Sequence, residues 1–269
     1  FERIEAAVEV PAPLPLGAVW KLSGADARET DSRLGQRRTL RWRQAGFQAS
    51  DWMTSWLGWT AGAAFERWPD TAQRPRGDKT RVAGRMLLAG GEWFDAHVTL
   101  EGWLGTPGAT RASTEARLTR GAAGGRAMLA GGMEGVHGYT PVFIIPGAGD
   151  GNTRRPLLRA HPLIHDDALS VADGQILARR VFYGTAEWSR PLARVLFAAI
   201  DGTLFVDAAH GRQLIDGRLR DTQVDAGAGL RIRALGAGPT VRLDLARGLR
   251  DGRWAFTAGT VVGIPEWIF

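Results

Sequence analysis

The chain has 269 residues, a net charge of +6 and no cysteine. Without cysteine, disulfides and thiolate metal sites are excluded, and no apolar run of about 18 residues marks a helical membrane span. The arginines are dispersed at alternate strand positions rather than clustered, so the charge does not indicate a nucleic-acid-binding surface. The eleven tryptophans, many of them near predicted strand ends, suit either a core or an interfacial aromatic girdle.

The N-terminal half alternates apolar and polar residues, the pattern of strands with one apolar and one polar face. Glycine pairs at Gly90-Gly91 and Gly124-Gly125 predict hairpin turns. The polar stretch 26–35 is expected to be a loop. The chain begins at Phe1 without an initiator methionine, as expected of a processed chain or a fragment. Predicted strands lie at residues 3–11, 17–22, 37–47, 52–68, 81–89, 96–104, 110–119 and 126–136.

A long segment without periodicity follows, at about residues 137–177. It contains several glycines and four prolines, at positions 141, 146, 156 and 162. A loop of this length inside a β domain is usually functional or disordered. His161 and His165 with the following aspartates lack the helical context of a metal site, and no phosphate loop or nucleophile elbow occurs. We therefore expect neither a cofactor nor a catalytic site.

Alternation resumes at Ala178 and continues through five further strands. Leu204 and Val206 share one face of their strand, against Thr203 on the other. In a soluble sandwich the apolar face is buried, whereas in a transmembrane barrel it meets lipid and the polar face lines the lumen. In the barrel reading, the charged residues expected to face inward are Glu187, Asp201, Asp207, Arg231 and Arg242.

Together the runs give about twelve visible strands of roughly 9–12 residues, a length that crosses a bilayer when tilted. No linker or persistent helical period divides the chain. We predict an all-β fold, a single antiparallel transmembrane β-barrel domain over 1–269. Closure is expected because it removes the edges that a sheet of this size would expose.

Five strand motifs carry a resemblance to a known family. In order they read EWSRPL at 187–192, LFVDAA at 204–209, GAGLR at 227–231, VRLDLA at 241–246 and WAFTAG at 254–259. Over about residues 155–262 the chain resembles the C-terminal barrel of the BamA/TamA superfamily, the bacterial surface antigens. The resemblance implies part of a 16-stranded barrel, or a shortened member, in the outer membrane of a Gram-negative bacterium.

The resemblance also implies a function that is not enzymatic: assisting insertion or translocation of outer-membrane proteins. The implied partners are outer-membrane lipid, unfolded outer-membrane protein substrates, and periplasmic domains or accessory proteins. Trp254, Phe256 and Gly259 would belong to the closing strand, which meets the first strand at a weak seam. Two alternatives stay open: a translocator or pore barrel for an N-terminal passenger such as a patatin-type lipase, and a soluble ligand-binding β protein.

Family members carry an Arg–Gly–aromatic motif in the long loop, which folds back into the lumen. Here Arg159 matches the arginine, while Ala160 and His161 stand in place of the glycine and the aromatic residue. A buried guanidinium needs carboxylate partners, so we predict that Arg159 pairs with Asp207 or Glu187 and locks the loop to the wall. Alternatively, Arg159 is solvated and the acids pair with the lumenal Arg231 and Arg242.

Overall fold

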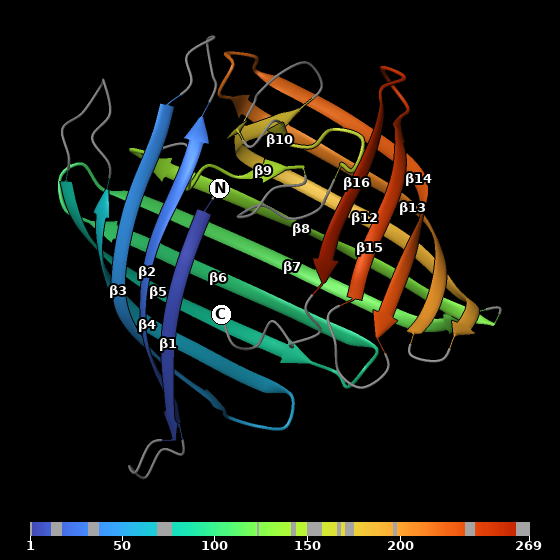
Figure 1. Ribbon diagram of the computed structural model, residues 1–269. Helices are drawn as coiled ribbons and strands as arrows, with labels where there is room; N and C mark the ends of the chain where they lie inside the picture. The colour runs from blue at the N-terminus through green and yellow to red at the C-terminus, as the bar shows by residue number, and fades with distance from the viewer. Residues whose placement is uncertain are drawn as a thin grey trace.

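A computed structural model shows the chain as a strongly curved sheet of β-strands (Figure 1). The described residues contain no helix long and apolar enough to cross a membrane. The structure describes residues 2–11, 18–31, 38–68, 77–122, 124–140, 144–149, 158–165, 168–169, 175–195, 198–234 and 240–261.

Eight long strands precede the long loop and five follow it. The first eight are β1 (Glu2–Pro11), β2 (Val19–Asp31), β3 (Arg38–Trp52), β4 (Leu57–Trp68), β5 (Gly77–Ala89), β6 (Phe94–Leu104), β7 (Ala109–Ala122) and β8 (Gly125–Gly138). The loop holds three two-residue strands, β9 (Gly147–Ala148), β10 (Ile164–His165) and β11 (Ala168–Leu169). The last five are β12 (Ile176–Val195), β13 (Ala198–Leu214), β14 (Arg220–Ala234), β15 (Thr240–Gly248) and β16 (Trp254–Val261).

Each long strand pairs antiparallel with the next, and β8 pairs directly with β12 across the loop. The strands therefore form one all-β antiparallel sheet, as predicted. The expectation of closure is wrong for the described residues, because nothing pairs the outer edge of β1 with that of β16. Strand direction alternates along the sheet, so β1 and β16 run the same way (Figure 1) and cannot form an antiparallel ladder with each other.

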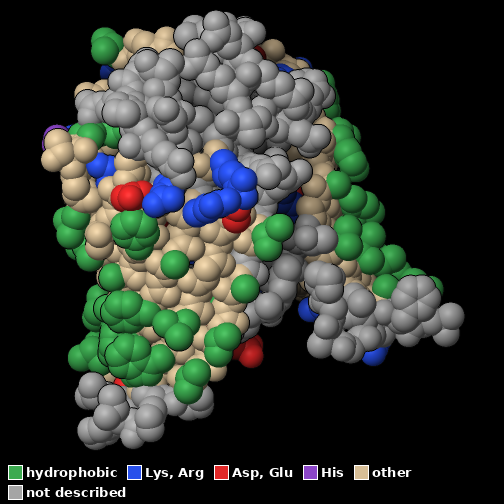
Figure 2. Space-filling model, turned by 60° about the vertical axis from the view of Figure 1, so that its left-hand side comes forward, with side chains coloured by type: hydrophobic (Ala, Val, Ile, Leu, Met, Phe, Trp, Pro, Cys, Tyr) green, Lys and Arg blue, Asp and Glu red, His purple; other side chains and the backbone are tan. Residues whose placement is uncertain are grey.

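The wall has its apolar side chains on the outside and its charged side chains on the inside, the reverse of a soluble sandwich. Large apolar side chains point away from the enclosed side and are exposed, Leu100 by 60% and Leu204 by 56%. The enclosed side carries charge, and Asp207, Asp225 and Asp244 are fully buried there. Figure 2 shows the apolar side chains as a band over the outer wall. Such an inside-out distribution is typical of a barrel wall surrounded by lipid.

The polar stretch expected as a loop at 26–35 is strand as far as Asp31, the end of β2. Asp26 accepts a hydrogen bond from Arg41 Nε (2.7 Å) and pairs with Arg43 Nε (3.2 Å), both on β3. Cross-strand ion pairs therefore maintain the ladder where the composition alone suggested a loop. The run at 52–68 is likewise divided, by a turn in which Met53 N donates to Leu57 O.

The inner face of the N-terminal wall is joined by a buried polar network. Trp103 Nε1 donates to Glu66 Oε2 at 2.7 Å, and Arg81 lies 3.1 Å from both Glu66 and Glu101. Glu101 also faces Arg111 at 3.6 Å. Four neighbouring strands, β4 to β7, are thus tied together from within.

We expect Trp103→Phe to lower the free energy of unfolding by about 1.5–3 kcal/mol, because it removes a donor to a buried carboxylate. Equilibrium urea unfolding in detergent micelles measures the change. Trp93→Phe is the matched control, since Trp93 is 62% exposed, and should change stability by less than about 0.5 kcal/mol. Equal losses in the two variants would show that the Trp103–Glu66 bond adds nothing specific.

Candidate functional site

The long loop returns to the enclosed side of the wall as a tight turn, residues 158–161. Leu158 has a positive φ of 56°, and His161 N donates to Leu158 O at 2.8 Å. Leu158 and Ala160 are completely buried, and Ala160 packs against Phe205 and Ala246 of the wall. Ala160 has a negative φ, so alanine is tolerated where the resembling family has glycine.

Arg159 at the centre of this turn lies against the C-terminal wall. Its Nη2 donates to Glu187 Oε2 at 2.9 Å, and its Nε lies 3.2 Å from Asp207 Oδ2. Its Nη1 is 3.7 Å from Asp244 Oδ2, and its guanidinium carbon lies 3.7 Å from the centre of the Phe205 ring. The side chain is only 5% exposed. Carboxylates and an aromatic face from three strands, β12, β13 and β15, therefore enclose one guanidinium.

The wall arginines join the same cluster. Arg231 reaches Glu187 at 3.0 Å and Asp244 at 2.6 Å, and Arg242 Nε lies 3.1 Å from Asp244. The pairings expected as alternatives thus occur together, but Arg159 is buried and not solvated as the second alternative required. Arg159, Arg231 and Arg242 balance Glu187, Asp207 and Asp244, so the cluster carries no net charge. Asp201 lies apart from it and faces the exposed Arg233 at 3.6 Å.

His161 completes the docking of the turn. Its Nδ1 is 2.8 Å from Asp225 Oδ1 on β14, and its Nε2 is 2.8 Å from Asp251 Oδ2 in the β15–β16 turn. Ala160 N donates to the other Asp225 oxygen at 2.7 Å. Burial disfavours the charged imidazole, but the hydrogen bonds that it donates to Asp225 and Asp251 outweigh this effect and raise the pKa of His161 above its ordinary value.

We expect docking of the turn to weaken as pH rises. Because the pKa of His161 is raised by folding, its stabilisation is complete below the ordinary value of 6.5 and is lost as pH rises through the folded value. Limited proteolysis of the loop, at pH values from about 6 to 9, measures the release. His161→Gln should abolish the pH dependence of loop cleavage. If cleavage of this variant depends on pH as in the wild type, the dependence arises from another group.

No described group of His, Asp and Glu side chains has a metal-holding arrangement. Both ring nitrogens of His161 are engaged by carboxylates. The aspartates at 166–167, considered with His165 as ligands from the sequence, lie outside the described residues.

The closing strand predicted from the sequence is β16, which pairs only with β15 among the described strands. Trp254 and Phe256 point outward and are 60% and 67% exposed. Gly259 lies on the inner face, where an added Cβ would meet Arg242. The structure thus places the predicted aromatics on the outer wall next to a free edge, away from the Arg159 cluster.

Four contributors to the site were not predicted. Asp225 and Asp244 lie on the inward face, and alternation along β14 and β15 was the signal that could have found them. Phe205 shares the inward face with Asp207 but is apolar, so the pattern assigned it no role. Asp251 lies in a turn, where no periodic signal exists.

No family model matches the chain, and no curated protein matches it. A solved structure does show its fold class: the sheet is similar to a BamA-type β-barrel, as the strand motifs suggested. The match is to BamA from Haemophilus ducreyi lacking POTRA domains 1–3, with a TM-score of 0.68 and 11% sequence identity. It covers 96% of this chain and 62% of that one, so the chain spans less than two thirds of that protein's length.

Proposed function

We propose that residues 1–269 form one outer-membrane β-barrel domain of the insertase or translocase type in a Gram-negative bacterium. The observation that carries this proposal is the inside-out wall, with exposed leucines outside and buried ion pairs inside. A soluble ligand-binding protein would leave this large apolar surface in water. The similarity of the fold to BamA supports the insertase type.

The proposed mechanism is physical and uses neither a cofactor nor catalysis. Among the described residues, the outer edges of β1 and β16 have no strand partner, so their backbone groups can template an incoming strand of an unfolded outer-membrane protein. Membrane lipid, such substrates, and periplasmic domains or accessory proteins are the proposed partners. Nucleic acid is not among them.

The long loop contacts the flanks of both free edges. Through β11 it pairs Leu169 with Asp31 of β2, the strand next to β1. Through Arg159 it reaches Asp244 on β15, the strand next to β16. We therefore assign the loop the role of a brace that fixes the spacing of the two edges across which a substrate strand enters. Arg159, Glu187 and Asp207 form its principal anchor.

The test is reconstitution of the refolded chain into phosphatidylcholine vesicles. Flotation with the vesicles and heat-modifiable gel migration are expected of a membrane barrel, and full solubility without detergent would overturn the proposal. Vesicles containing the barrel should also speed the folding of an added unfolded outer-membrane protein relative to empty vesicles. Ion conductance without such acceleration would instead identify a translocator pore.

A further inference from the structure

Three arginines lie directly opposite one another on the outer face of neighbouring strands. Arg180 of β12 pairs in register with Arg212 of β13, which pairs with Arg220 of β14. All three are exposed, and they share the outward face with Phe182, which is 42% exposed. Because successive side chains alternate faces, this row points away from the docked loop.

Like charges directly opposite in a sheet repel each other. No acidic side chain among the described residues forms an ion pair with any member of this row. A second outward row, on β2 to β5, is built differently. There Arg43 pairs with Asp26 at 3.2 Å and Arg67 with Asp78 at 2.9 Å, and Figure 2 shows charged side chains above the apolar band. The row on β12 to β14 therefore lacks the anions that the other row carries within the chain.

Both rows lie at the same distance along their strands from an outward tryptophan. Arg180 is eight residues from Trp188 on β12, and Arg67 is eight residues from Trp59 on β4. Eight residues span about 26 Å of strand, or about 20 Å along the membrane normal at a tilt of about 40°. This is close to the height of about 25 Å expected for the apolar band of a barrel, whose borders carry aromatic girdles. The arginines therefore lie at the border opposite the tryptophans, where lipid headgroups are found.

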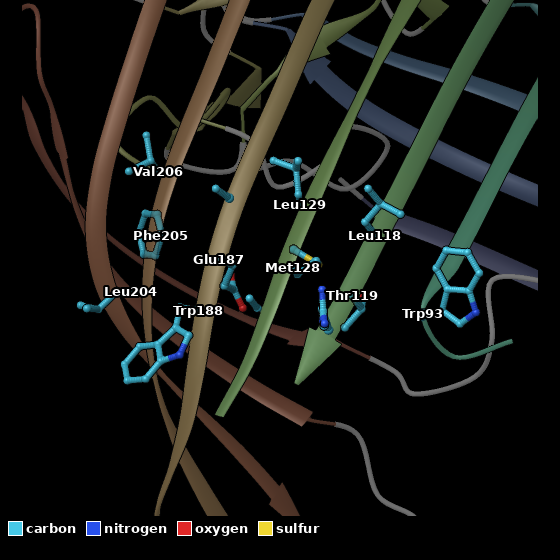
Figure 3. Close-up of a pocket in the computed structure, with 13 residues that line it drawn as sticks. Trp93, Leu118, Thr119, Met128, Leu129, Glu187, Trp188, Leu204, Phe205 and Val206 are labelled. Atoms are coloured by element: carbon cyan, nitrogen blue, oxygen red, sulfur yellow. The ribbon is translucent and has the colours of Figure 1, made fainter. Parts of the chain in front are cut away.

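An apolar groove of about 860 Å³ lies on the same face of the wall, towards the tryptophan border. It crosses β7, β8, β12 and β13 and is lined by Leu129, Trp188 and Leu204, among others (Figure 3). Between Arg180 and the groove, β12 presents Phe182 and Gly184 outward, and Ala186 lines the groove itself. This path suits an extended acyl chain whose headgroup remains at the arginines.

We propose that Arg180, Arg212 and Arg220 bind the phosphate group of an anionic membrane lipid in the leaflet on the loop side of the barrel, with an acyl chain extending into the groove. Guanidinium groups match phosphate in charge and donor geometry, and a bound phosphate replaces repulsion along the row with attraction. The site rests on the proposed membrane placement of the barrel.

The test uses the full chain in nanodiscs of mixed phosphatidylglycerol and phosphatidylcholine with the same acyl chains. Native mass spectrometry gives the ratio of the two lipids retained on the barrel. Arg180→Gln/Arg212→Gln/Arg220→Gln should lower the preference for phosphatidylglycerol by on the order of tenfold or more. The control Arg41→Gln/Arg43→Gln/Arg67→Gln removes the same three charges and should change the ratio by less than about twofold.

The lipid site would be overturned if both triple variants lost the preference for phosphatidylglycerol equally, or if Arg180→Gln/Arg212→Gln/Arg220→Gln kept it. Displacement of phosphatidylglycerol by excess inorganic phosphate would overturn it as well, because the site would then recognise free phosphate. Flotation of every variant with phosphatidylcholine vesicles and unchanged heat-modifiable migration show that the barrel is intact. A wild-type chain that fails to float would contradict the membrane placement itself, a result distinct from a floating barrel without lipid preference.

Discussion

Arg159→Ala is expected to lower the free energy of unfolding by on the order of 3 kcal/mol and to release the loop turn from the wall. The guanidinium is 5% exposed and contacts carboxylates on three strands. Its removal leaves Asp207 fully buried without its guanidinium partner, while the Thr185 hydroxyl still donates to it at 2.6 Å. An unpaired buried carboxylate is strongly unfavourable, so the loss exceeds that of an ordinary surface ion pair.

Urea unfolding in micelles measures the stability of the Arg159 variant, and limited proteolysis reports release of the loop. Arg159→Lys retains the charge but not the planar fork or the stacking on Phe205, so it should recover only part of the loss. In Arg159→Leu/Asp207→Asn no charge is left unpaired, and the double variant should be more stable than Arg159→Leu. Arg233→Ala is the control, because Arg233 is 60% exposed and faces Asp201. Unchanged proteolysis in Arg159→Ala would refute the role of the arginine as an anchor.

If the brace sets the spacing of the free edges, releasing it should affect folding of substrates as well as stability. The contacts through β11 and through Arg159 lie on opposite flanks of the opening. Loss of one anchor lets the edges move independently, while the ladders within each flank stay paired. A variant with released loop but unchanged substrate-folding rate would separate the anchor from the proposed insertase activity.

Much of the wall could be predicted from the sequence, because period-two alternation is a local property of each strand. It assigned Glu187 and Asp207 to one face and Leu204 to the other before any strand pairing was known. That the face with Glu187 and Asp207 points inward was inferred from its charges and from the family resemblance. Asp207 and Glu187 were named as alternative partners of Arg159, but Asp244 was not, because it is brought to Arg159 by the register of several strands and the path of an irregular loop.

The unpaired edges of β1 and β16 show a second limit to what can be predicted from the sequence. Alternation predicts that strands exist but not how many lie between the two ends of the sheet. Adding or removing one strand reverses the direction of the last strand relative to the first. In this sheet, β1 and β16 run in the same direction. The polar run at 26–31 was misread for a related reason, since Asp26 is stabilised by arginines of the neighbouring strand rather than by anything local.

Asp244→Ala is expected to cost more than Arg159→Ala, on the order of 3–5 kcal/mol, because it affects the wall itself as well as the loop. Asp244 is fully buried and lies within 4 Å of three arginines: Arg231 at 2.6 Å, Arg242 at 3.1 Å and Arg159 at 3.7 Å. Its loss leaves three guanidinium groups facing two carboxylates in a largely buried site. Repulsion then acts between Arg231 and Arg242, which lie opposite each other on β14 and β15.

Hydrogen exchange distinguishes this effect from release of the loop. In Asp244→Ala, amides of β14 and β15 should lose protection, whereas in Arg159→Ala they should keep it while the loop becomes cleavable. Asp216→Ala is the matched control, since Asp216 pairs with Arg218 in an exposed turn and should leave both regions protected. Asp244→Asn preserves the shape but not the charge, so a loss close to that of alanine would assign the effect to electrostatics rather than packing. Protection of β14 and β15 in Asp244→Ala equal to that in the wild type would show that this carboxylate does not hold the strands beside the free edge of β16.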